Sequence, residues 1–328
     1  MERTVDRNLA LELARVTEAA ALMAARHMGR GDKIAADQAA VDAMRSVLAS
    51  VDMDGIVVIG EGAKDEAPML FIGEQVGTGR EPAVDIAVDP IDGTRLLALG
   101  MPNAIAVVAV ADRGTMLSSP DISYMDKIVV GAEAAGSVDI NATVADNLAG
   151  IAAAKGRAVT DLTVVVLDRP RHERLIDEIR AAGARIRLIP DGDVAGAVMA
   201  ATPGTGIDAL MGIGGAPEAV VAACAIKCIG GEMQCRRSPR NEAESTIAAE
   251  QGIDLVQVLT VDDLVASDNV FFAATGITDG ELVRGVRYFG DGAITQSLVM
   301  RSRTGTIRRI EATHRLSKLR ALGGLQFD

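Results

Sequence analysis

An acidic hexapeptide at residues 89–94 is the segment of this chain that most clearly suggests chemistry. Its sequence is Asp89-Pro90-Ile91-Asp92-Gly93-Thr94, and it follows the apolar stretch 83–88, which is typical of a buried strand. Pro90 fixes its own backbone φ and Gly93 permits a sharp turn, so we expect a rigid turn that holds two carboxylates and a hydroxyl together. Neighbouring carboxylates repel each other unless a cation or a proton lies between them. Because Mg²⁺ and Mn²⁺ prefer oxygen ligands, the turn indicates a site for a hard divalent metal.

Two carboxylates upstream strengthen this interpretation. Glu61 follows a short β-branched run at 56–59, so it lies at the tip of a second expected strand. Asp37 precedes a helical pattern that we expect from Gln38 to Ser50. Aspartate and glutamate also favour turns and helix starts, so neither residue alone indicates a metal site. Together with the hexapeptide, however, they could form a cage of acidic side chains around one point.

The motifs also resemble a known family. Gly60-Glu61 followed by the hexapeptide is similar to the signature of the lithium-sensitive, metal-dependent sugar and inositol phosphatase superfamily. The segments 31–37, 59–70 and 213–218 resemble class II fructose-1,6-bisphosphatase, and the match runs over nearly the whole chain. The resemblance implies hydrolysis of the 1-phosphate of fructose 1,6-bisphosphate, giving fructose 6-phosphate and phosphate in gluconeogenesis. It also implies Mg²⁺ or Mn²⁺ as cofactor and a layered α-β-α-β-α sandwich.

Metal ligands and substrate residues follow from the same resemblance. Asp37 and Glu61 match ligands of one metal ion, and Asp89, Asp92 and Glu218 match ligands of a second. The positions that match the family's sugar-phosphate site are Asp92, Gly93, Thr94, Tyr124, Arg169, Pro170, Arg171, Asp191, Gly192, Asp193 and Gly215.

The catalytic hypothesis centres on Thr94. Its hydroxyl, hydrogen-bonded to Asp37 or Asp65, would orient or deprotonate the attacking water, while two metal ions lower the pKa of that water. Lys33 and Asp65 lie inside matching motifs and are further catalytic candidates. Arg169 and Arg171 would hold the 6-phosphate, which does not react.

Periodicity predicts an α/β protein with two parts. In residues 1–150, helices at 9–28 and 38–50 precede strands at 56–59, 83–88 and 104–111, which suggests an α+β metal-binding domain. In residues 151–328, strands and helices alternate, which predicts a parallel sheet in an α/β substrate-binding domain. The expected strands are 162–167, 186–189, 207–211, 269–274, 283–289 and 295–300, and the expected helices are 171–182, 194–200 and 217–228. Ligands gather beyond the carboxyl ends of parallel strands, where Arg169, Asp191 and Gly215 lie.

Composition limits the other classes of function. The net charge is −12 and aromatic residues are only 2% of the chain, so we expect no nucleic-acid or membrane partner. No apolar run reaches about 18 residues, and the charged start of the chain does not look like a secretory signal. Three cysteines suggest a reducing compartment, so a cytoplasmic protein is expected. A sugar bisphosphate is the expected small-molecule partner, and a homo-oligomer, either a dimer or a tetramer, the expected assembly.

Three other interpretations stay open. The substrate could be sedoheptulose 1,7-bisphosphate or an inositol monophosphate, although two arginines favour a substrate with two phosphates. Gly212-Ile213-Gly214-Gly215 after a strand suggests a nicotinamide dehydrogenase, but the dinucleotide-binding fingerprint is incomplete. A sugar-phosphate sensor that binds without hydrolysis is the third.

Overall fold

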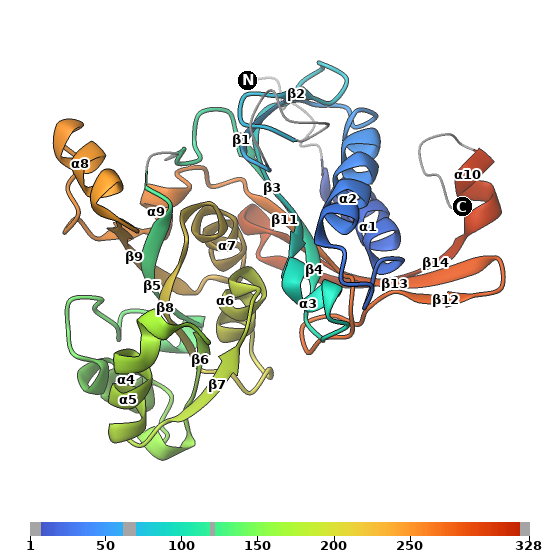
Figure 1. The fold of residues 1–328 in the computed structure, drawn as a ribbon. Helices are drawn as coiled ribbons and strands as arrows, with labels where there is room; N and C mark the ends of the chain where they lie inside the picture. Colours follow the sequence, from blue (N-terminus) through green and yellow to red (C-terminus); the bar gives the residue numbers. More distant parts are fainter. Residues whose placement is uncertain (1–7, 62–69, 119–121, 322–328) are drawn as a thin grey trace.

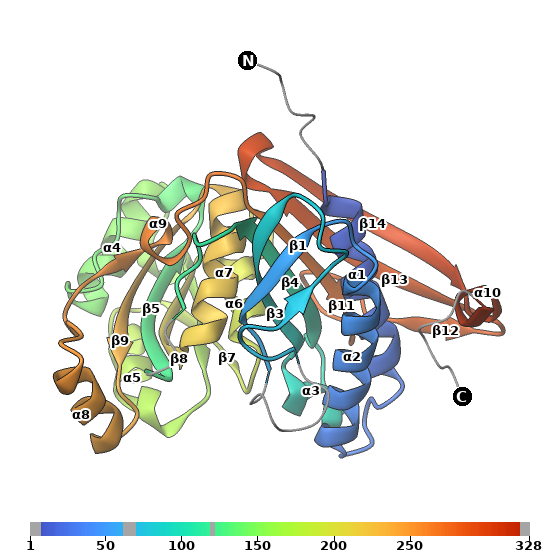
Figure 2. The ribbon, with the colours of Figure 1, turned by 90° about the horizontal axis from the view of Figure 1, so that it is seen from above.

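The computed structural model describes residues 8–61, 70–118 and 122–321, and it shows five layers of helices and sheets (Figures 1 and 2). The helices are α1 (Ala10–Ala25), α2 (Lys33–Leu48), α3 (Thr94–Ala98), α4 (Val144–Ala154), α5 (Glu173–Ala181), α6 (Asp193–Ala201), α7 (Ala216–Ile229), α8 (Glu242–Glu250), α9 (Val261–Leu264) and α10 (Leu316–Ala321). The strands are β1 (Asp54–Ile59), β2 (Gln75–Val76), β3 (Ala83–Asp92), β4 (Ile105–Asp112), β5 (Tyr124–Val130), β6 (Thr163–Leu167), β7 (Arg185–Ile189), β8 (Ala209–Gly215), β9 (Glu232–Ser238), β10 (Leu259–Thr260), β11 (Phe271–Gly276), β12 (Arg287–Phe289), β13 (Gly292–Arg301) and β14 (Thr306–Arg315).

Two sheets alternate with three helical layers. The first sheet has the order β12-β13-β11-β4-β3-β1-β2, with β14 paired to β13, and the second has the order β10-β9-β5-β8-β6-β7. Helices α1 and α2 cover the outer face of the first sheet, α6 and α7 lie between the sheets, and α4 and α5 cover the outer face of the second (Figure 2). The α/β class predicted from the sequence is therefore confirmed. In the described part of the chain, no helix is both long enough and apolar enough to span a bilayer.

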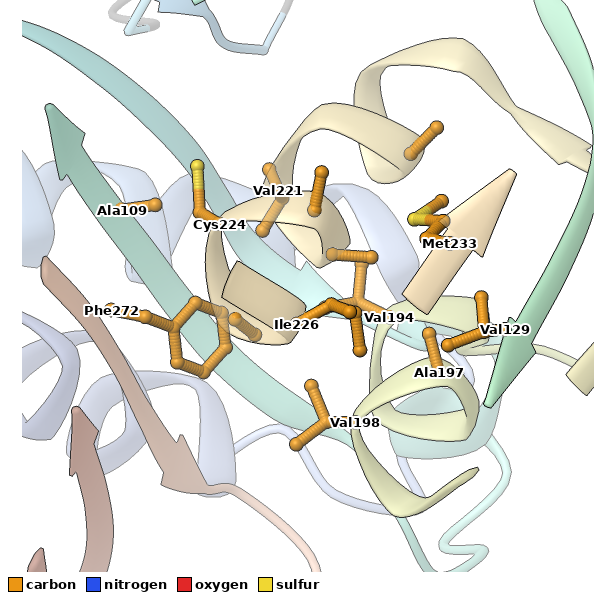
Figure 3. Packing of buried hydrophobic residues seen from close by; sticks show 14 of the residues in the cluster. Ala109, Val129, Val194, Ala197, Val198, Val221, Cys224, Ile226, Met233 and Phe272 are labelled. Carbon is orange, nitrogen blue, oxygen red and sulfur yellow. The ribbon is translucent and has the colours of Figure 1, made fainter. Parts of the chain in front are cut away.

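The layer between the sheets forms the largest apolar core. Side chains of α6 and α7, such as Val198 and Cys224, pack between Phe272 of β11 and Met233 of β9 (Figure 3). Cys224, Cys228 and Cys235 are free thiols buried in this core, and burial raises the pKa of Cys228 and of Cys235 to about 12. They contribute as apolar packing groups, as free cysteines commonly do.

Strand β4 illustrates why its sequence is a continuous apolar run. Ile105, Val107 and Ala109 face the core between the sheets, whereas Val108 and Val110 face α1 and α2. A strand that is buried on both faces cannot alternate with polar residues. The strand predicted at 104–111 is thus confirmed, and it is buried on both faces.

Several predicted boundaries were wrong. Strand β3 does not stop before the hexapeptide but continues through Pro90 to Asp92, and α2 begins at Lys33, so Asp37 lies inside this helix. Strand β8 runs from Ala209 to Gly215, later than the predicted 207–211.

Some elements were not predicted at all, and they change how the chain is divided. Strands β5, β9 and β14 and helices α4 and α8 were missed. β5, from the first half of the chain, lies in the second sheet, while β11 to β14 return to the first sheet (Figure 1). The second sheet is also mixed: β8 pairs in parallel with β6 but antiparallel with β5. A domain boundary near residue 150 stays a prediction, but the sheets themselves do not divide there.

A buried acid on α1 makes stability depend on pH. Glu18 is only 9% exposed, and burial raises its pKa from 4.5 to about 7 despite the lowering effect of Arg15. The folded protein therefore binds this proton more tightly than the unfolded chain does. The resulting stabilisation is complete below pH 4.5 and is lost as the pH rises through about 7.

We therefore expect Glu18→Gln to stabilise the protein above neutral pH, by up to about 3 kcal/mol, and to leave stability near pH 4.5 almost unchanged. Urea denaturation at both pH values measures this. A variant that is equally or less stable than the parent protein above pH 7 would contradict the assignment.

Candidate active site

The two aspartates of the hexapeptide are positioned by an irregular end of β3. Its pairing with β4 shifts register between Asp89 and Asp92, and such an irregularity accommodates Pro90, which has no N–H to donate. The backbone N–H of Ile91 donates to Asp89 Oδ1 at 3.1 Å. Gly93, with φ +93°, adopts the left-handed conformation that lets the chain turn directly into α3. The two carboxylates are thus held at the junction of β3 and α3, as predicted, although the strand extends further than expected.

The N-terminus of α6 faces Asp92 from the layer between the sheets. The backbone N–H of Ala195, in the first turn of α6, donates to Asp92 Oδ2 at 2.9 Å. Gly192 precedes α6 with φ +82°, and a Cβ at this position would lie 3.4 Å from Asp92 Oδ2. The turn before α6 therefore packs directly against the hexapeptide.

Thr94 and Asp37 meet as the catalytic hypothesis requires. The hydroxyl of Thr94 donates to Asp37 Oδ1 at 3.1 Å, and the carbonyl oxygen of Ile91 lies 3.2 Å from the same hydroxyl. Thr94 is the first residue of α3, and Asp37 lies in the second turn of α2. Two helices that are distant in sequence therefore bring these side chains together.

Glu218 depends on the glycines at the end of β8. It lies in the first turn of α7, and a Cβ at Gly215 would come within 1.7 Å of Glu218 Oε2. Within the described structure, Glu218 Oε2 is a buried oxygen without a hydrogen-bond partner. An unpartnered buried carboxylate oxygen is unfavourable, and a cation would satisfy it.

These residues surround one cavity of about 250 Å³. Its lining includes Glu61, Asp89, Ile91, Asp92, Gly93, Thr94, Tyr124, Leu167, Arg169, Arg171, Asp191, Gly192, Asp193, Gly214, Gly215 and Glu218. Acidic residues that are distant in sequence therefore line one cavity, whereas their convergence on a metal ion stays a prediction. The role of each residue stays a prediction.

Among the described sequence candidates, Pro170, Lys33 and Asp37 do not line this cavity. Pro170 is exposed and begins a short 3₁₀ helix between the two arginines. Lys33 is exposed at the start of α2. Burial raises the pKa of Asp37, and the charge of Lys33 offsets this shift only in part. Asp65 lies outside the described residues. Asp37 is therefore the carboxylate partner of Thr94 in the described structure.

Two arginines form the basic side of the cavity. Arg169 donates to the carbonyl oxygen of Pro190 at 2.6 Å and lies 3.6 Å from Asp191 Oδ1. Arg171 donates through Nε and Nη2 to the carbonyl oxygen of Ile213, at 3.1 and 2.7 Å. Its guanidinium lies 4.9 Å from the ring centroid of Tyr124, a favourable cation–π geometry. These contacts orient both guanidinium groups and leave further N–H groups available for an anion.

Burial and mutual repulsion disfavour the charged form of the acidic residues. Desolvation, followed by the charge of Asp92, raises the pKa of Asp89 well above its usual range, and desolvation followed by the charge of Asp193 does the same for Asp92. Desolvation, together with the charges of Asp37 and Glu218, raises the pKa of Glu61 to about 7, although this residue keeps exposed surface. Desolvation also raises the pKa of Glu218.

The residues present fit hard divalent cations. All the candidate ligands are carboxylates, which suit Mg²⁺ or Mn²⁺, and one of their oxygens is buried without a partner. Among the described residues, no three His, Cys, Asp or Glu side chains already form a closed ligand cluster. Without a cation, the carboxylates of the site repel one another. A bound cation would attract them toward a common position.

Sequence reasoning missed two residues beside the cavity. Lys127 is buried on β5 and bonds to Asp193, and its only signal in the sequence is a charge between the apolar positions Met125 and Val129. His172 accepts from the backbone N–H of Ile213 at 2.7 Å through Nε2, so its Nδ1–H donates to the carbonyl oxygen of Leu167 at 2.7 Å. It thereby ties the end of β6 to the end of β8.

Acidic groups suited to cations, set opposite guanidinium groups suited to phosphate, define a phosphatase. The comparison with known proteins agrees, because the family model described as "Bacterial fructose-1,6-bisphosphatase, glpX-encoded" matches residues 7–314. The chain belongs to this family.

Similar curated proteins carry the same name. The chain is 49% identical over 325 residues to "Fructose-1,6-bisphosphatase 1 class 2" of Escherichia coli (strain K12), covering 95% of this chain and 96% of that protein. Identity and coverage are the same for "Fructose-1,6-bisphosphatase class 2" of Escherichia coli O6:H1 and of Shigella flexneri.

Proposed function

We propose that this protein hydrolyses the 1-phosphate of fructose 1,6-bisphosphate and releases fructose 6-phosphate and inorganic phosphate. The observation that carries the proposal is that Glu61, Asp89, Asp92 and Glu218 line one cavity, which Arg169 and Arg171 line as well. A sugar bisphosphate needs both halves: an acidic site that can hold cations at the reacting phosphate and a basic site for the second phosphate.

Divalent cations belong to this proposal. Asp37 and Glu61 would hold one ion, and Asp89, Asp92 and Glu218 a second, with Mg²⁺ or Mn²⁺ as the candidates. When bound, such ions supply Lewis-acid polarisation of the phosphoryl group and lower the pKa of water.

In this proposal, protein side chains carry out the proton transfer and position the substrate. Thr94 accepts a hydrogen bond from the attacking water and passes its own proton toward Asp37, which lies 3.1 Å away. The water oxygen forms a bond to phosphorus as the bond from phosphorus to the O1 oxygen breaks. The leaving O1 takes a proton from solvent water and becomes the sugar hydroxyl, and Asp37 returns its proton to solvent. Arg169 and Arg171 hold the 6-phosphate, and the acidic turn at 191–193 faces the sugar hydroxyls.

The wider setting is also part of the proposal. We place the protein in the lithium-sensitive metal-dependent phosphatase superfamily and in gluconeogenesis, as a cytoplasmic homo-oligomer. The absence of a membrane-spanning helix from the described residues is compatible with this setting. Tyr124 of β5 and Gly215 of β8, two of the proposed substrate residues, lie on neighbouring strands of the second sheet.

A phosphate-release assay tests the proposed function. We expect rapid release from fructose 1,6-bisphosphate with Mg²⁺ or Mn²⁺, and a loss of more than about 100-fold after EDTA that is restored by adding either ion back. Inositol monophosphate, which lacks a second phosphate for the arginines, serves as the comparison substrate. Equal turnover of both substrates, or turnover that is insensitive to EDTA, would contradict the proposal.

A further inference from the structure

Lys127 is a buried cation in an apolar layer. It lies on β5 between Met125 and Val129, and both of these neighbours belong to the core between the sheets. The lysine is only 3% exposed, and a buried ammonium group is costly unless it is paired. Its Nζ donates to Asp193 Oδ2 at 2.5 Å, and Asp193 is itself 8% exposed.

The neighbouring strand leaves room for this pair. A Cβ at Gly214 of β8 would lie 1.9 Å from Asp193 Oδ2 and 2.9 Å from Lys127 Nζ. The backbone of Gly214 is not in the left-handed region, so a glycine is needed here for space rather than for conformation. Gly214 and Asp193 line the cavity, whereas Lys127 lies behind them.

Lys127 does not line the cavity, but its positive charge also offsets part of the negative charge of the site. The charge of Asp193 raises the pKa of both Asp92 and Glu218, and the charge of Lys127 lowers the pKa of Glu218. Burial alone would lower the pKa of Lys127, but Asp193 and Glu218 outweigh it, so the lysine stays protonated.

We propose that Lys127 is a positioning residue for substrate recognition. Its ammonium group fixes Asp193 Oδ2, so that the remaining oxygen, Oδ1, is oriented to accept a hydrogen bond from a hydroxyl of the sugar. The lysine acts through Asp193 and touches neither substrate nor cation. This inference rests on the proposed function only in taking a sugar phosphate as the ligand.

Binding measurements separate this role from a merely structural one. We expect Lys127→Met to weaken binding of fructose 6-phosphate at least about 10-fold, as measured by calorimetry, because a hydrogen bond to a charged acceptor is lost. Inorganic phosphate has no sugar hydroxyls, so its affinity should change by less than about 3-fold. The ratio of the two affinities is the readout, and a general loss of stability would not move it.

A second lysine provides a matched control. Lys155 Nζ lies 2.7 Å from Asp208 Oδ1 at the opposite end of β8, away from the cavity. Lys155→Met removes a lysine that also pairs with an aspartate, although Arg157 still holds Asp208, and it should leave both affinities unchanged. Should Lys127→Met fail to fold, Gly214→Ala replaces it, because the added Cβ displaces the same pair without removing a charge.

An unchanged ratio in the folded variant overturns the role of Lys127, and so does an equal weakening for both ligands. Phosphate release by the wild-type protein reports separately on the proposed function. A protein that releases phosphate but shows no change of ratio retains the function and loses this inference, while a changed ratio supports the inference whatever the turnover.

Discussion

Replacing Thr94 by alanine is expected to lower kcat for phosphate release by about 10²–10⁴-fold while KM changes little. The hydroxyl of Thr94 donates to Asp37 Oδ1 at 3.1 Å, so in the proposed mechanism it links the attacking water to that carboxylate. Alanine keeps the start of α3 and removes only this link. Steady-state kinetics with saturating Mg²⁺ or Mn²⁺ measures the effect.

Thr94→Ser is the matched control, because it keeps the hydroxyl and removes only a methyl group. We expect it to recover most of the activity. The loss in Thr94→Ala should not come from unfolding, since one lost hydrogen bond costs only about 0.5–1.5 kcal/mol. Turnover of Thr94→Ala within a few-fold of the wild-type value would remove Thr94 from the mechanism.

The second large effect is expected for Glu218→Gln. This change preserves the shape of the side chain and removes its charge, so the buried Oε2 no longer offers a cation a full negative ligand. We expect activity to fall by more than about 100-fold, beyond the 10–100-fold typical of losing a group that only orients a ligand. Calorimetric titration with Mn²⁺ should show weaker binding in parallel.

Stability without cations should move in the opposite direction. Burial, followed by the charge of Asp193, disfavours the ionised form of Glu218, so the metal-free Glu218→Gln protein should melt at the same or a higher temperature than the metal-free wild type. Glu173→Gln is the control, since Glu173 also lies in the first turn of a helix but is exposed and outside the cavity. Unaltered Mn²⁺ affinity of Glu218→Gln would rule out its role as a ligand.

Site residues whose neighbours in the sequence suggest their role could be predicted from the sequence alone. The hexapeptide at 89–94 combines a proline, a glycine and two acids within one turn, so its contribution can be predicted without the fold. Glu218 was also predictable, because small residues crowd its position and a helix begins there. The strand end was harder to place: Pro90 suggests a stop, but a register shift in β3 allows pairing with β4 to resume at Asp92.

The residues that the sequence could not predict act through tertiary contacts. In the sequence, nothing distinguishes Lys127 from other charged residues. Only the fold brings Asp193, at the start of α6, close enough to pair with it. Strand β14 alternates polar and partly buried residues with many arginines, and only its pairing along the whole of β13 makes it a strand. The return of β11 to the first sheet likewise depends on its pairing with β4, from which about 160 residues of chain separate it.

The origin of the cavity walls has a mechanical consequence. Asp89 and Thr94 belong to the first sheet and the helix that follows it, Tyr124 and Arg169 to the second sheet and its loops, and Glu218 to the helix between the sheets. Substrate and ions bound here would connect the two sheets and the helix between them. Without a cation, the carboxylates repel one another across the cavity. We therefore expect the rigidity of the molecule to depend on bound ions. Replacing either sheet by one from another protein would remove part of the site.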